Sequence, residues 1–296
     1  MSLVNYYKEV RDDDGKLVAV TSDTNLPLPS EVRNRWCYGL PLNKEDGEVM
    51  PDEDILQYLK SAINEVERKL GIYLKPTKIV TNPDERGLVK GKDFDREEPA
   101  YDYDAKRYRQ YGFLQLRERP VISLESFKMV LPNGLTIIDF YRDNDTKKWI
   151  KLYKDAGQVH IVPYAGDPTI FAMLGGTATG YPFATGRINT NLPQMFYVDY
   201  TAGFEAYRIP DDIRNVVAKI ASIDILGLAG DAILAGVASL STSIDGLSES
   251  FSTTASATNA TYGAHILQYQ KEVDKFFSPK SGGARSAHRG ITFTGL

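Results

Sequence analysis

The apolar residues of the C-terminal third recur at helical spacing in two runs that flank a serine-rich stretch. The first run follows Ile209-Pro210-Asp211-Asp212, where a proline in the first turn and two carboxylates at the positive end of the helix dipole indicate a helix start. The pattern predicts a helix near 210–226, followed by a glycine-containing break at Gly227 and Gly230. The second run predicts a helix near 258–277. We therefore expect a helix, a hairpin and a helix in that order.

The serine-rich stretch between those helices has the alternating pattern of a β-hairpin over 237–253. Asp245-Gly246 supplies the residues of a tight turn. Alternation across that turn predicts one face of serines and one apolar face, which is formed by Leu240, Ile244, Leu247 and Phe251. The segment has the pattern of a packing element, with no catalytic motif in it.

A further amphipathic helix is predicted near 52–70, where the apolar positions fall on one helical face. Pro51 and three acidic residues begin it, and Gly71 stands where a C-terminal glycine cap is expected. Upstream, Asp14-Gly15 predicts the turn of an exposed N-terminal hairpin. The acidic run at this turn lacks the alternating ligands and distal glutamate of a calcium loop, which favours a solvated turn.

From Lys75 to about Glu205 the pattern changes to short apolar segments separated by marked turns, which predicts an antiparallel sheet or a small barrel. Two long loops interrupt this region. The loop at 82–111 mixes charges with tyrosines, and we expect it to be too polar to form a core and mobile until a neighbour orders it. The second loop, at 175–186, is rich in glycine.

The predicted fold class is α+β: a helical body with an antiparallel β insert and extended N- and C-terminal arms. The predicted regions are an N-terminal hairpin and arm (1–50), a helical body (51–74 and 206–277) with the hairpin at 237–253, a β-rich insert (75–205) and a C-terminal tail (278–296). The chain of 296 residues is long enough to bury a sizeable core in one large domain or two small ones.

The composition argues against several classes of function but does not select one. A net charge of -4 and a pI near 5.6 argue against a surface that coats nucleic acid, although DNA can still pass along a mildly acidic wall. The single cysteine, Cys37, allows no internal disulfide and no multi-cysteine zinc site. No apolar run approaches the ~20 residues that span a bilayer, and no signal peptide is visible. We expect a soluble protein in a reducing cytoplasm, with no membrane partner.

No enzyme signature is found, and we expect no catalytic residue, metal or cofactor. The glycine-rich loop after Leu174 continues with Tyr181-Pro182, where a phosphate-binding loop has Lys followed by Ser or Thr. His160, His265 and His288 lack the spacing of metal ligands. We interpret His160 as an outward-facing or hydrogen-bonded strand residue and His265 as an interface or surface residue. The serines lie outside any Gly-x-Ser-x-Gly elbow.

Four segments carry a resemblance to a known protein family by their order and spacing. They are the helix at 52–70, Arg117-Glu118-Arg119-Pro120-Val121-Ile122-Ser123-Leu124-Glu125-Ser126, Val198-Asp199-Tyr200-Thr201-Ala202-Gly203-Phe204 running into Ile209-Pro210-Asp211-Asp212-Ile213-Arg214, and the serine-rich hairpin with the final helix ending Lys271-Glu272-Val273. Together they resemble the tailed-bacteriophage head–tail connector proteins, also called adaptor or head-completion proteins. The resemblance covers about residues 50–130 and 195–277 and leaves out the N-terminal arm and most of the β insert.

The resemblance implies a non-enzymatic virion protein in the neck, at the head–tail interface. It implies a homo-oligomeric ring of about twelve copies that binds the portal protein and extends the DNA channel. Double-stranded DNA would pass through without sequence specificity, and the ring would offer an attachment surface to the next tail or neck component. The protein would be made in the host cytoplasm.

Two extremities are the predicted partner-binding sites. The hairpin residues Leu240, Ile244, Asp245, Gly246, Leu247 and Phe251 either cover the helices of their own subunit or project to an adjacent subunit or into the channel, and we favour projection. The tail either touches nothing or adds as a strand to a neighbouring sheet edge, with its basic residues against acidic groups of a partner. We favour docking through Arg285, His288, Arg289, Ile291 and Phe293.

The alternative function is a β-rich tail or receptor-binding module that uses the loops at 82–111 and 175–186. Ligand or cell-surface binding by the isolated β insert would favour this alternative. A ring that forms alone or with the portal would favour the connector.

Overall fold

The computed structural model describes residues 6–38, 40, 42, 48–104, 113–130, 134–142, 144–161, 192–205, 208–233, 239–244, 247–252 and 262–278. The chain divides into two compact units. We call them the β unit, within residues 72–205, and the helical unit, within residues 5–71 and 206–288. Helices and sheets both contribute, so the α+β class is confirmed. No helix among the described residues is long and apolar enough to cross a membrane.

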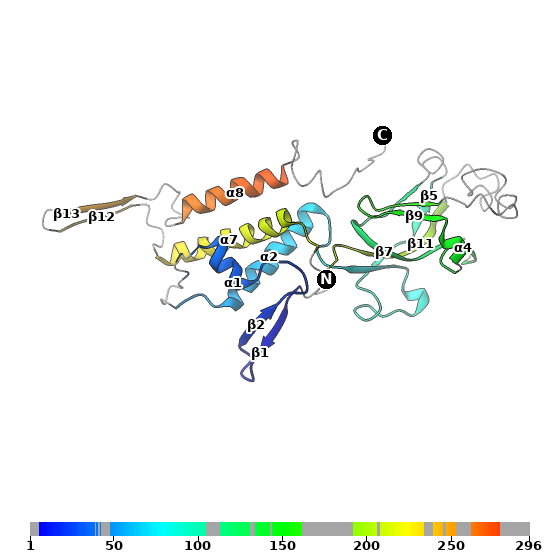
Figure 1. The fold of residues 1–296 in the computed structure, drawn as a ribbon, viewed down its shortest axis with the longest axis horizontal. Coiled ribbons are helices and arrows are strands. Elements are labelled where there is room, and N and C mark those ends of the chain that lie inside the picture. Colours follow the sequence, from blue (N-terminus) through cyan, green and yellow to red (C-terminus); the bar gives the residue numbers. More distant parts are fainter. Residues whose placement is uncertain are drawn as a thin grey trace. The chain divides into compact units, whose positions relative to one another are not determined.

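Three long helices form the core of the helical unit (Figure 1). They are α2 (Asp52–Leu70), α7 (Asp211–Ile233) and α8 (Gly263–Phe277). Helix α7 packs against both α2 and α8, and the short α1 (Pro29–Glu31) and η1 (Val32–Trp36) pack beside them. The buried face of α2 consists of Ile55, Leu56, Leu59, Ala62, Ile63, Val66 and Leu70. Burial of each large apolar side chain contributes about 1.5–3 kcal/mol.

Helix α2 has the bounds that its sequence predicts. Gly71 adopts the left-handed conformation, with φ of 65°, and its N–H donates to the carbonyl of Glu67 at 2.7 Å. A glycine takes this conformation without the steric cost of a Cβ atom, so Gly71 ends the helix.

The predicted break at Gly227 and Gly230 is wrong, because α7 continues through both glycines to Ile233. A glycine inside a helix costs only about 1 kcal/mol relative to alanine. Ile225, Leu226 and Ala229 are fully buried around these positions, and their burial outweighs that cost. The second predicted helix of the C-terminal third forms α8, which begins at Gly263. Residues 258–261 of that predicted helix lie outside the described residues.

The N-terminal hairpin forms as the Asp14-Gly15 signal predicts. Strands β1 (Lys8–Arg11) and β2 (Leu17–Thr21) pair antiparallel, with an irregularity between Val10 and Arg11. Gly15 has φ of 79°, which a tight turn requires.

Two sheets and two short helices make up the described part of the β unit. The six-stranded sheet has the order β4 (Arg96–Glu98), β3 (Thr77–Thr81), β11 (Leu192–Ala202), β7 (Val121–Val130) and β8 (Thr136–Asp139), and β5 (Tyr101–Tyr103) also pairs with β11. The three-stranded sheet has the order β6 (Phe113–Gln115), β10 (Gln158–Ile161) and β9 (Ile150–Tyr153), and α4 spans Asn144–Lys147. Among the described strand pairs of the insert, β3 and β4 are parallel and the others are antiparallel, which corrects the prediction of an antiparallel insert.

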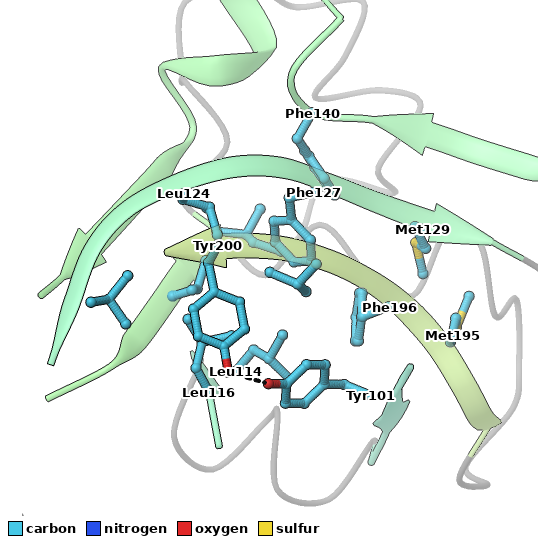
Figure 2. Packing of buried hydrophobic residues seen from close by; sticks show 14 of the residues in the cluster. Tyr101, Leu114, Leu116, Leu124, Phe127, Met129, Phe140, Met195, Phe196 and Tyr200 are labelled. Atoms are coloured by element: carbon cyan, nitrogen blue, oxygen red, sulfur yellow. Dashed lines mark hydrogen bonds between the residues drawn. The ribbon is translucent and has the colours of Figure 1, made fainter. Parts of the chain in front are cut away.

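One core is shared by residues of both sheets (Figure 2). The aromatic ring of Phe127 lies 5.0 Å from that of Phe140 and 5.6 Å from that of Phe196 between centroids. Aromatic pairs at this separation add to the stabilisation that burial alone provides. Val159 and Ile161 of the smaller sheet complete the same cluster.

The expectation that 82–111 is too polar to form a core is wrong for the described part of that loop, 82–104. It contains the short helix η2 (Asp84–Arg86) and the strands β4 and β5. Phe94, Tyr101 and Tyr103 are buried, and both tyrosines belong to the core. The reason is hydrogen bonding, since a polar group can be buried where its partners are buried with it. Residues 105–111 and the loop at 175–186 lie outside the described residues.

Candidate functional site

The hairpin between α7 and α8 is built from β12 (Ser239–Ile244) and β13 (Leu247–Ser252) (Figure 1). The two strands pair antiparallel without a register shift. The register places Leu240 opposite Phe251 and Ile244 opposite Leu247, and it places serine opposite serine at alternate positions. The apolar residues of the predicted site therefore occupy paired positions of one ladder.

The remaining residues of the predicted site are not part of the described structure. Asp245 and Gly246 stand between the two strands in the sequence, and they fall outside the described residues. The same holds for the tail residues, which are Arg285, His288, Arg289, Ile291 and Phe293. Docking of the tail stays a prediction.

A second surface is the N-terminal hairpin, which ion pairs attach to α2. The Lys60 ammonium lies 2.6 Å from the Glu9 carboxylate, and the Arg11 guanidinium lies 2.8 Å from that of Glu53. Hydrogen bonds from Lys60 and then from Arg11 hold the pKa of Glu9 below its usual value. Val10 and Val18 remain exposed on the strands. Ion pairs from Glu9 and Arg11 thus hold β1 against α2, while the hairpin presents apolar side chains to solvent.

A third surface is the loop at 82–95 in the β unit, which is anchored by Arg86. The Arg86 guanidinium forms a bidentate pair with the Asp199 carboxylate of β11, with N–O distances of 2.6 and 3.0 Å. The other partner of that carboxylate is the Thr81 N–H, at 3.1 Å. Asp199 is only 7% exposed, so the pair is shielded from solvent on the carboxylate side. Bidentate pairs of this kind fix orientation as well as contributing energy.

A buried carboxylate, Glu98, organises the neighbouring part of the β unit. Glu98 is 5% exposed, and it accepts hydrogen bonds from the hydroxyls of Tyr101, at 2.8 Å, and Tyr200, at 3.2 Å. The Arg117 guanidinium lies 3.4 Å from the same carboxylate and 4.0 Å from the centre of the Tyr101 ring. The two hydroxyls also contact each other at 3.3 Å (Figure 2).

This network has the chemistry of a structural element. The hydroxyl oxygens of Tyr101 and Tyr200 accept from the backbone N–H groups of Arg117 and Glu118, at 3.1 and 3.2 Å. Burial raises the pKa of both tyrosines well above its usual value, so both hydroxyls stay protonated donors. Every polar group in the cluster has a partner, and the cluster fixes the segment that leads into β7.

Three titratable side chains outside that network, two histidines and a cysteine, pack against other groups of the described structure. His160 lies between the rings of Phe113 and Tyr153, and partial burial lowers its pKa. His265 is exposed on α8 with its ring against Tyr269. Cys37 is buried, and burial raises its pKa to about 11. Within the described ranges, no group of three His, Cys, Asp or Glu side chains could hold a metal ion.

Sequence reasoning missed the pairs Glu98–Arg117 and Arg86–Asp199. Their partners lie far apart along the chain, and Arg86 and Asp199 are separated by 113 positions. One local signal was available, because Tyr101 and Tyr103 alternate with aspartates as strand residues do.

Comparison with known protein families and with curated proteins finds no match. Among solved structures, the chain is similar to a chain in the neck of an empty gene transfer agent (GTA) particle, computed with C6 symmetry, and to one in the virion of a native GTA particle. Each has a TM-score of 0.36 and 17% identity over 89% of this chain and 94% of the other.

Proposed function

We propose that the protein is a structural virion protein, a ring-forming head–tail connector that binds the portal, extends the DNA channel and provides the tail attachment surface. The observation that carries the proposal is the pairing of the segments that resemble the connector family. In the helical unit, the first segment and the final helix both pack against the helix that begins in the third segment. In the β unit, the second segment pairs with the strand of the third segment.

In the helical unit, the segment at 52–70 forms α2 and packs against α7, which begins at the resembling residues Asp211 and Asp212. The buried faces of both helices meet, with Ile55 and Leu59 on α2 and Ile213 on α7 all fully buried. The final helix α8 also packs against α7, and the Lys219 ammonium lies 2.5 Å from the Glu272 carboxylate.

In the β unit, the segment around 121–126 forms the first half of β7 and pairs with the end of β11. The register joins Ser126 to Asp199, Leu124 to Tyr200 and Val121 to Ala202. Gly203 follows directly, and an added Cβ atom there would lie 2.3 Å from the carbonyl oxygen of Lys75. The resembling residues are thus placed where the chain passes from the sheet toward α7.

The two extremities of the helical body are the proposed contacts with neighbours. The apolar positions of the β12–β13 ladder would contact an adjacent subunit or line the channel, where neutral serine hydroxyls would not grip DNA. The tail would add as a strand to a neighbouring sheet edge, with Arg285 and Arg289 against acidic groups. We expect about twelve copies in the ring and contact with DNA that does not depend on sequence.

Sedimentation velocity of the full chain, alone and with the portal protein, tests the proposal. We expect a ring-sized species that forms alone or on addition of the portal. A chain that stays monomeric with the portal present, and that is absent from purified virions, would contradict the proposal.

Deletion of residues 279–296 tests the tail separately. If the tail docks, we expect the truncated chain to bind the portal at least 10-fold more weakly while its helical unit melts at the same temperature. Unchanged portal binding would exclude docking of the tail on the portal.

A further inference from the structure

The loop at 82–95 has a preformed tip in addition to its anchored base. The Asp93 carboxylate accepts the Val89 N–H at 2.9 Å, and the Gly91 N–H donates to the Phe94 carbonyl at 2.7 Å. At the base, the Asp95 carboxylate accepts the Lys78 N–H at 2.8 Å. Phe94 is buried beneath the tip. The tip is therefore held in one shape before any partner arrives, which reduces the ordering cost of binding.

The outer side of this tip combines one apolar and two cationic side chains. Val89 is 57% exposed, and Lys90 and Lys92 on either side of Gly91 are exposed. Neither lysine ammonium has an ion-pair partner within the described part of the chain. A folded tip that keeps a valine and two unpaired cations in solvent has the chemistry of a contact for an acidic surface.

The N-terminal hairpin has the complementary chemistry. Val10 is 53% exposed and Val18 is 65% exposed on its strands. At its turn, the Asp12 carboxylate accepts a hydrogen bond from the Lys16 N–H at 2.7 Å. Asp13 and Asp14 are exposed and have no side-chain partner among the residues that the structure describes. Ion pairs from Glu9 and Arg11 to α2 hold this hairpin, and the Arg86–Asp199 pair holds the loop.

We propose that the loop tip of one copy docks on the N-terminal hairpin of a second copy of this chain. Lys90 and Lys92 would face Asp13 and Asp14, and Val89 would pack against the exposed valines of the hairpin. The two patches are different surfaces of one chain, so the contact is head-to-tail, and repeated head-to-tail contacts close a ring when the rotation allows it. This inference rests on the proposed function and names the subunit contact of the proposed ring.

Charge reversal tests the contact, with ring assembly measured by sedimentation velocity. One variant carries Lys90→Glu and Lys92→Glu, and the other carries Asp13→Lys and Asp14→Lys. We expect each variant alone to need at least a 10-fold higher concentration to assemble, because like charges then face each other. An equal mixture should assemble as the wild type does, since each reversed loop meets a reversed hairpin. Lys151→Glu with Lys154→Glu, two exposed lysines of the β unit, is the matched control and should assemble normally.

The outcomes separate the two ideas. If wild type assembles and both variants assemble equally well, the docking contact is wrong and the ring stands. If the chain with all four reversals assembles but the mixture does not, the two patches meet within one copy, and the intermolecular contact is overturned. If wild type forms no ring with the portal, the proposed function itself fails. Circular dichroism melting should show the same transition in all variants, because every substituted side chain is exposed.

Discussion

The two units bury polar groups very differently. In the helical unit, the face of α2 that packs inward is entirely apolar, and its charged groups pair at the surface. In the β unit, the carboxylates of Glu98 and Asp199 are buried and are held by tyrosine, arginine and backbone partners. The apolar face of α2 can be recognised in the sequence, because its apolar residues recur at helical spacing. The buried carboxylates of the β unit cannot be recognised in this way, because their partners come from distant segments. The helical unit is specified mainly by its hydrophobic pattern, whereas the β unit is specified also by hydrogen-bonded pairs between distant residues.

Each unit contains one buried tryptophan, which allows the comparison to be measured. Trp36 lies in the helical unit and Trp149 in the β unit. Fluorescence of a Trp149→Phe chain reports unfolding of the helical unit, and that of a Trp36→Phe chain reports the β unit.

The largest expected loss comes from the apolar core of the helical unit. Leu59→Ala should lower the free energy of unfolding by about 3 kcal/mol, because it removes a fully buried side chain and leaves a cavity. Urea unfolding read by Trp36 measures the loss. Leu267→Ala on α8 is the control, since Leu267 is 44% exposed, and it should cost less than about 0.5 kcal/mol. Equal losses in both variants would contradict the packing of α2.

The second-largest loss of stability is expected from removal of the buried Glu98 carboxylate of the β unit. Glu98→Ala should cost about 2 kcal/mol, because the hydroxyls of Tyr101 and Tyr200 lose their acceptor while they remain buried. Glu98→Gln keeps one acceptor oxygen and should cost about half as much. Urea unfolding read by Trp149 measures both. If Glu98→Ala is as stable as wild type, the network does not hold the β unit together.

These two predictions show what the sequence could and could not reveal. The bounds of α2 follow from the spacing of its apolar residues and from Gly71, and both are local signals. The end of α7 was misplaced because Gly227 was weighed without the burial of its neighbours. β4 and β5 were missed because Glu98 is stabilised by Tyr200, 102 positions away, and no local pattern reports such a partner.

The candidate surfaces also divide into one that local sequence signals predict and one that depends on a distant partner. The strands of the serine-rich hairpin and their paired apolar positions were predicted, because alternation is a local feature. The anchored loop at 82–95 was not, because its shape depends on the pair between Arg86 and Asp199.

A smaller, pH-dependent loss is expected in the helical unit. Burial raises the pKa of Cys37 from 9.0 to about 11, so the folded chain keeps this proton more tightly than the unfolded chain. The resulting stability is fully present below pH 9.0 and is lost as the pH rises toward about 11. Near pH 10 the loss should be about 1.4 kcal/mol. The difference between wild type and Cys37→Ala, followed by Trp36 from about pH 8 to 10, isolates this loss; equal slopes would contradict it.

The smallest effect on stability should come from the hairpin, although its effect on assembly should be large. Ile244→Ser with Leu247→Ser replaces a directly paired position of β12 and β13. If this position contacts a neighbouring subunit, unfolding of the monomer should change by less than about 0.5 kcal/mol while ring formation weakens at least 10-fold. Ser243→Ala with Ser248→Ala, the adjacent serine pair, is the matched control. The reverse result would place the hairpin in the core of its own subunit.

Electron microscopy of the neck of purified virions is the most direct test of the central claim. We predict a ring of this chain between the portal and the first tail component, with the helical units forming the body of the ring around the channel. A neck in which this chain is absent, or present as isolated copies on the tail, would contradict it.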